Sequence, residues 1–130
     1  MQDSRSGFNV GADDADMRGL LERRSLVPEA TFCSEQGWST VALRKACFEK
    51  RVFAVEMLGK LYFPSFYLDE RYDRRQLESV CKVLGDLTGG SKLQFFTTPK
   101  GSLGGRTALE ALAGGDVVLV RRAAQGFVER

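Results

Sequence analysis

The sequence has 130 residues, of which 43% are hydrophobic and 28% are charged, as in one ordinary small domain or two very small ones. It contains no histidine, which excludes Ser-His-Asp and Cys-His catalysis and most common zinc and iron sites. Its 19 Lys and Arg residues nearly balance its 17 Asp and Glu residues, and the resulting formal net charge of +2 does not by itself indicate a nucleic-acid partner. Without a secretory signal or a run of about 18–20 apolar residues, we expect a cytoplasmic protein with no membrane partner.

The three cysteines, Cys33, Cys47 and Cys81, are odd in number and widely spaced. This pattern fits neither a disulfide framework nor a zinc site. We expect three small buried side chains in a reducing compartment. The sequence predicts no metal ligand, no cofactor and no catalytic residue, so an enzyme is the least favoured class.

The first residues of the chain are expected to lie outside the folded part. Residues 1–12 are polar and contain glycine, which predicts a disordered tail. From Asp13, the run DDADMRGLLERR has acidic residues first and basic residues last, which suits the dipole of a short helix. The folded part therefore begins near residue 13.

Two helices separated by a glycine come next. Pro28 suits the first turn of one helix, and Gly37 suits the position just past its end. Ser39 is a natural N-cap for the second helix, in which Leu43 and Ala46 recur at the spacing of a buried face. The order of helix, glycine turn and helix predicts a helix-turn-helix.

The pattern then changes to β-branched and aromatic residues in the run VFAVEMLGKLYFPSF. This composition predicts a β-hairpin centred on Leu58, Gly59 and Lys60. Pro64 must end the strand ladder or lie on its edge, because it has no amide N–H. Since a hairpin after a helix-turn-helix is a wing, residues 13–68 are predicted to be a winged helix-turn-helix-like DNA-binding domain.

The second half of the chain has helical patterns throughout. A strong helix is expected after Asp73, a short one capped by Ser91, another from Thr107 to Ala113, and a last one after Asp116. We therefore predict a mainly α protein with one small β-hairpin. Residues 69–130 are expected to form a small helical bundle that follows the winged helix-turn-helix-like part.

The outward face of the second helix carries the residue types that bind DNA. Hydroxyls, Arg and Lys contact phosphates, and Arg also reads guanine edges. A solvated charged face gives the same pattern, and Glu49 and Glu56 dilute the positive charge. The candidate DNA-binding residues are Ser39, Thr40, Val41, Arg44, Lys45, Lys50, Arg51 and Lys60.

The glycine-rich stretch TPKGSLGGRTALEAL invites comparison with a phosphate-binding loop. In the Walker A spacing, Lys100 would take the place of the first glycine and Arg106 that of the lysine. The dinucleotide-binding pattern is absent as well, so nucleotide binding is not expected. Thr107 and Glu110 instead have the spacing of a T-x-x-E capping box.

Residues 91–127 resemble the C-terminal toxin-binding domain of the Xre/MbcA/ParS-type antitoxins. The family pattern has an aromatic-rich lead-in, a proline, LGG-x-T-P-L-E-x-L, a Gly/Asp break and a final helix. Here Ala108 replaces the usual proline, and Phe95 or Phe96 replaces the tryptophan of the lead-in. The matching positions, which a purely structural role also explains, are Leu103, Gly104, Gly105, Thr107, Leu109, Glu110 and Leu112.

The resemblance implies a non-enzymatic, homodimeric protein that binds double-stranded operator DNA and occludes a toxin, often of the RES-domain type. On this basis we expect an antitoxin-like protein that represses its own operon. One alternative is a stand-alone transcriptional regulator without a toxin, and another is a protein–protein adaptor that does not bind DNA. The candidate partner-binding residues are Lys100, Arg106, Arg121, Arg122, Gln125 and Arg130.

Overall fold

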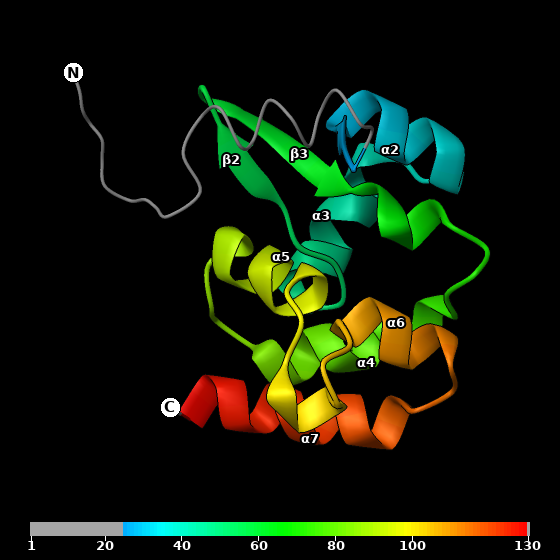
Figure 1. The fold of residues 1–130 in the computed structure, drawn as a ribbon. Coiled ribbons are helices and arrows are strands. Elements are labelled where there is room, and N and C mark those ends of the chain that lie inside the picture. The colour runs from blue at the N-terminus through cyan, green and yellow to red at the C-terminus, as the bar shows by residue number, and fades with distance from the viewer. Residues whose placement is uncertain (1–24, 130) are drawn as a thin grey trace.

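The computed structural model describes residues 25–129. The predicted tail, the predicted helix from Asp13 and the candidate residue Arg130 lie outside this range. The described chain is mainly helical with a small antiparallel sheet, which confirms the predicted fold class. In Figure 1, β2, β3, α2 and α3 lie in the upper part of the molecule, with α4, α6 and α7 below them.

The strands all lie in the first half of the described chain, and the second half is helical. In chain order the elements are β1 Leu26–Pro28, α2 Glu29–Gln36, α3 Thr40–Phe48, β2 Val55–Met57, β3 Lys60–Pro64, the 3₁₀ turn η2 Ser65–Leu68, α4 Arg74–Leu84, α5 Gly89–Thr97, the 3₁₀ turn η3 Gly101–Leu103, α6 Ala108–Ala113 and α7 Val117–Glu129.

The turn between α2 and α3 is built as the sequence predicts. Gly37 ends α2 with φ 74°, and its N–H donates to the Cys33 carbonyl over 2.9 Å. The left-handed conformation costs glycine least, because it has no Cβ. Ser39 then caps α3 by accepting a 3.0 Å hydrogen bond from the Ala42 N–H. Both ends of the turn are therefore set by local chemistry.

The sheet has three antiparallel strands in the order β1-β3-β2. The predicted hairpin is confirmed, with Met57 opposite Lys60. Pro64 is the last residue of the central strand, β3, where it pairs with Leu26 of β1. Strand β1 was not predicted, because it is three residues long and its partner is distant in the sequence.

The tip of the hairpin is a two-residue loop in which both residues have positive φ. Leu58 has φ 54° and Gly59 has φ 77°, as in a type I′ turn. Glycine, asparagine and aspartate favour this conformation, whereas it costs leucine about 1–2 kcal/mol. The hairpin therefore holds a strained leucine at its outermost point.

One hydrophobic core runs through both halves of the described chain. Phe96 of α5 stacks on Phe53, with ring centroids 6.1 Å apart, and packs against Phe66 at 4.9 Å. These contacts cross the predicted boundary between residues 68 and 69. The two predicted domains are therefore joined by shared packing, whatever their separate roles.

The helices of the second half pack mainly as pairs, with α7 lying along α4 (Figure 1). Helix α5 begins at Gly89 with Thr88 as its N-cap, so the predicted cap at Ser91 is wrong. Thr88 Oγ1 accepts the N–H of Ser91 over 3.1 Å, which makes the two residues partners in one cap. Within residues 25–129, no helix combines the length and the apolar character needed to cross a membrane.

Candidate functional site

The exposed side of α3 brings together four of the residues predicted to bind DNA. Thr40, Val41, Arg44 and Lys45 are all exposed. Their spacing of one helical turn places them along one side of the helix, and the opposite side is buried in the core. The sequence pattern predicted this arrangement, because the buried positions of α3 recur every three to four residues.

Phe48 extends this side of α3 and was not predicted. Its side chain is 85% exposed, and that of Val41 is 78% exposed. Phe48 follows Arg44 by one turn, so the helical spacing that found Arg44 also locates Phe48. We call Thr40, Val41, Arg44, Lys45 and Phe48 the α3 face. It combines a hydroxyl, cationic groups and large apolar side chains.

Ser39, before α3, and Arg44, within it, are held by contacts within the chain. The hydroxyl of Ser39 is occupied by the helix cap. The Arg44 guanidinium lies 3.4 Å from a carboxylate oxygen of Glu29 on α2. An exposed ion pair of this kind is weak, so it holds the Arg44 side chain only loosely.

Lys50 and Arg51 turn toward α4 instead of the α3 face. Lys50 Nζ lies 2.8 Å from Asp86 Oδ1, and this hydrogen bond lowers the pKa of the Asp86 carboxyl. Arg51 is half-buried and pairs with Glu49 at 2.8 Å and with Glu78 at 3.5 Å. These contacts join the segment after α3 to α4 and to the loop that follows α4, so Lys50 and Arg51 are engaged away from Arg44 and Lys45.

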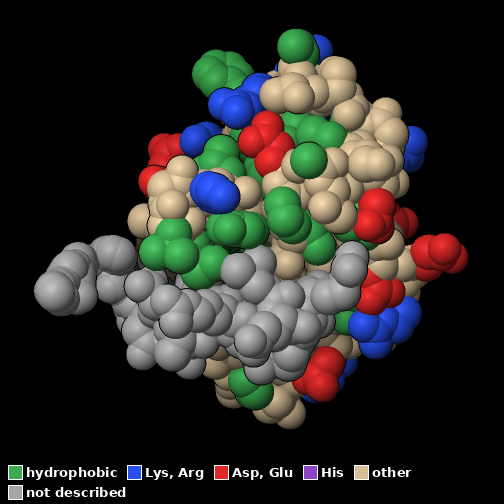
Figure 2. Space-filling view, turned by 90° about the horizontal axis from the view of Figure 1, so that it is seen from above, with side chains coloured by type: hydrophobic (Ala, Val, Ile, Leu, Met, Phe, Trp, Pro, Cys, Tyr) green, Lys and Arg blue, Asp and Glu red, His purple; other side chains and the backbone are tan. Residues whose placement is uncertain are grey.

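Lys60 lies next to the hairpin tip and is exposed. It belongs to a different element from the α3 face, so cationic groups stand on both the helix and the hairpin. In Figure 2, which looks down on the hairpin end, Lys and Arg side chains alternate with Asp and Glu around exposed hydrophobic groups. On the visible face, no single strongly basic field appears.

The predicted partner-binding residues fall into two groups. Lys100 and Arg106 close the glycine loop: the Arg106 guanidinium donates to the Leu103 carbonyl over 2.9 Å and to Asp116 over 2.9 Å. The Lys100 ammonium lies 4.5 Å from the centre of the Phe95 ring and donates to the Thr98 carbonyl. Both side chains therefore stabilise the loop.

The second group lies on α7 and is exposed. Arg122 and Gln125 share the outer side of this helix with Val118, which is 66% exposed, and Arg121 lies at its edge toward α4. A shallow hollow of about 410 Å³ lies between α7 and the loop that contains Pro99. The hollow is lined on α7 by Ala123, Gly126 and Phe127, so none of the exposed residues Arg121, Arg122 and Gln125 lines it.

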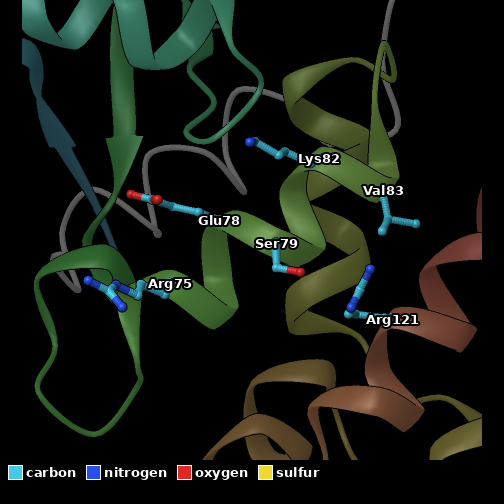
Figure 3. Close-up of a pocket in the computed structure, with 6 residues that line it drawn as sticks. All are labelled: Arg75, Glu78, Ser79, Lys82, Val83 and Arg121. Carbon is cyan, nitrogen blue, oxygen red and sulfur yellow. The ribbon is translucent and has the colours of Figure 1, made fainter.

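Another hollow, of about 400 Å³, lies between α4 and α7. Figure 3 shows Arg121 pointing from α7 toward Ser79 and Val83 on α4, whereas Glu78 and Lys82 extend to the other side. The cationic groups around this hollow do not converge on a common point. The geometry therefore gives no support to an anion-binding site there.

The structural motif predicted in the glycine loop is confirmed. Gly104 and Gly105 have φ values of 69° and 85°. Thr107 Oγ1 accepts the Glu110 N–H over 3.0 Å, and Glu110 Oε1 accepts the Thr107 N–H over 2.8 Å, so the capping box is complete. Leu103 and Leu112 are buried, and Leu109 is half-buried.

Of the three cysteines expected to be buried, Cys81 is buried in the core, whereas Cys33 and Cys47 are only partly buried against it. Burial raises the pKa of the Cys47 and Cys81 thiols, which keeps them protonated near neutral pH and weakens them as nucleophiles. Among residues 25–129, no cluster of three or more Cys, Asp or Glu side chains has the arrangement of a metal site.

Comparison with known proteins found no match: no family model, no curated protein and no solved structure corresponds to this chain. The resemblance of residues 91–127 to the antitoxins therefore stays a prediction. The functional assignment depends on the surfaces described above.

Proposed function

We propose that this protein is an antitoxin-like DNA-binding repressor that also binds a partner protein. In this proposal, α2, α3 and the β2–β3 hairpin form a winged helix-turn-helix, and α3 enters the major groove of duplex DNA. The observation that carries the proposal is the α3 face, which presents Thr40, Val41, Arg44 and Lys45 in one exposed stripe.

Each side chain of this stripe suits a group that duplex DNA presents, either a base edge in the major groove or a backbone phosphate. The Arg44 guanidinium suits the O6 and N7 acceptors of guanine, and Val41 suits the methyl group of thymine. Lys45 and the Thr40 hydroxyl suit phosphate oxygens. Lys60 on the hairpin supplies a second cationic contact, away from α3.

The topology supports the same interpretation. The α2–α3 pair comes between β1 and the β2–β3 hairpin, and β3 lies between the other two strands. The sheet thus anchors the hairpin to the strand that directly precedes α2. A rigid connection between helix and hairpin suits simultaneous contact with one duplex.

A salt titration by gel shift tests DNA binding. We expect the wild-type protein to shift the promoter region of its own gene at low salt. The affinity should fall steeply with salt, with a slope in log K of about 0.9 for each phosphate that is neutralised. The double variant Arg44→Ala, Lys45→Ala should bind much more weakly and with a shallower slope.

The matched control is Arg121→Ala, Arg122→Ala, which removes the same charge from exposed positions on α7. Its affinity should stay close to that of the wild type. No shift at low salt for the wild type, or an equal loss for both double variants, would refute the proposal that α3 reads DNA.

The exposed side of α7 is proposed as the partner surface. By resemblance, the partner is a toxin, with the RES-domain type as the first candidate, and the protein acts as a homodimer. Val118 and Arg122 lie on this surface, and neither belongs to the buried core. The double variant Val118→Glu, Arg122→Glu should therefore abolish co-purification with the product of the neighbouring gene and leave DNA binding intact.

A second candidate function is a protein–protein adaptor. The observation that favours it is the exposure of Val41 and Phe48 on the same side of α3, because large apolar groups are typical of protein interfaces. An adaptor would bind no duplex at low salt, and it would lose its protein partner on Val41→Ser, Phe48→Ser. A stand-alone regulator would bind DNA and have no toxin gene beside its own.

A further inference from the structure

The tip of the β2–β3 hairpin carries an exposed and strained apolar residue. Leu58 is 68% exposed and has φ 54°. It occupies the first position of a type I′ turn, where asparagine or glycine is common. The next residue, Gly59, faces open space, so Leu58 supplies the apolar side chain of the tip.

The strain at Leu58 has no compensation inside the described chain. The neighbouring apolar residues of β2, Val55 and Met57, are buried in the core, whereas Leu58 projects away from it. Backbone strain that brings no packing gain among the described residues is the kind that is retained at sites of contact with a ligand. The hairpin places this contact at its outermost point.

The chemistry of the tip favours nucleic acid over protein as the occupant. The nearest charged residue across the hairpin is Lys60, which faces Met57 in the register, whereas Glu56 lies one pair further from the tip. A stable protein interface needs about 800 Å² on each partner, which a single leucine does not provide. One apolar side chain beside a cation is the arrangement of a minor-groove wedge.

We propose that Leu58 is an apolar wedge that enters the minor groove of the DNA bound by α3, with Lys60 on the adjacent phosphate. The inference rests on the proposed function and deepens it, because it assigns the hairpin a role in bending the duplex. Wedges of this kind partially unstack a base step and kink the duplex by roughly 20–90°.

The test compares two substitutions at Leu58. Leu58→Asn suits the left-handed conformation and removes the wedge, whereas Leu58→Met keeps an apolar side chain. The probe is a duplex selected by the wild-type protein from a random-sequence pool. Leu58→Asn should melt at the wild-type temperature or above it, bind this duplex about tenfold more weakly, and bend it less in a circular-permutation gel shift.

Two further readouts separate the wedge from a phosphate contact. Leu58→Asn should leave the salt slope of log K unchanged, whereas Lys60→Ala should make it shallower by about 0.9, the value for one phosphate that is no longer neutralised. Leu58→Met should restore most of the affinity and the bend. Together these results would support a wedge.

Other outcomes would overturn the inference. If Leu58→Asn binds and bends DNA like the wild type, the wedge is refuted and the proposed function stands. If the wild-type protein selects no duplex, both are refuted. If Leu58→Asn instead changes the oligomeric state measured by sedimentation, the occupant of the tip is a second copy of the chain and the wedge is refuted.

Discussion

Gly89, the first residue of α5, is fixed by a close approach of two backbones. A Cβ at this position would overlap the carbonyl oxygen of Ala54, just before β2. The neighbouring Gly90 meets nothing within 4 Å. Only Gly89 therefore needs to lack a side chain, because α5 approaches the backbone of Ala54 at this position.

We predict that Gly89→Ala destabilises the protein by about 2–3 kcal/mol, because the backbone of Ala54 must shift to admit a methyl group. Gly90→Ala is the matched control and should be neutral or stabilising by up to about 1 kcal/mol, because alanine is the better helix former. Denaturant unfolding measures both. Equal effects for the two variants would contradict the close approach.

Lys92 is the charged residue that the described core contains. It is 4% exposed, and its ammonium lies 6.0 Å from the centre of the Phe53 ring. Burying a cation costs desolvation energy, and a well-packed apolar residue of similar volume often restores that energy. The aliphatic stem of Lys92 packs favourably among the apolar core residues, whereas burial of its ammonium is costly.

We accordingly predict that Lys92→Met leaves the free energy of unfolding unchanged or raises it by about 1–2 kcal/mol. Lys92→Ala should lower it by about 2 kcal/mol or more, because it leaves a cavity. Chemical denaturation of the three proteins checks this. A strong loss of stability in Lys92→Met would mean that the ammonium itself makes a required contact.

At the scale of single elements, local signals set the ends of the helices. The capping box of α6 and the glycines before it match the sequence pattern, because these contacts join residues three or four positions apart. The start of α5 was misplaced, since both Thr88 and Ser91 are plausible caps and share one hydrogen-bond network. Strand β1 could not be predicted from the sequence, because three residues are too few to show the alternation of buried and exposed residues typical of a strand.

We predict that Thr107→Ala destabilises the protein by about 1 kcal/mol, because it removes the hydroxyl that accepts the Glu110 N–H. Thr98→Ala, at an exposed position past the end of α5, serves as the control and should have little effect. Thermal unfolding followed by circular dichroism makes the comparison. If both variants melt at the same temperature, the cap contributes nothing measurable.

At the scale of the whole molecule, the two halves share one core. Phe96 packs on Phe53 and Phe66, and Arg51 reaches Glu78 of α4. Contacts of this kind couple the unfolding of the first half to that of the second. The α3 face and the α7 surface are thus displayed by a continuous scaffold.

We therefore predict a single cooperative unfolding transition. Fluorescence of Trp38 reports on the first half, and far-UV circular dichroism reports on the helices of both halves. If the protein unfolds as one unit, the two unfolding curves should coincide. A fragment of residues 1–72 should lack a stable fold, because it exposes Phe53 and Phe66. Two separate transitions, or a folded fragment with dispersed amide NMR signals, would indicate independent domains.

Features that depend on near neighbours could be predicted from the order of the residues. These are the helices around Gly37, the hairpin, the capping box and the outward side of α3, because each is set by residues a few positions apart. The ion pairs of Lys50 with Asp86 and of Arg51 with Glu78, the burial of Lys92 and the pairing of β1 with β3 follow from the three-dimensional packing. Those outcomes depend on segments far apart in the chain, whose approach no local pattern specifies.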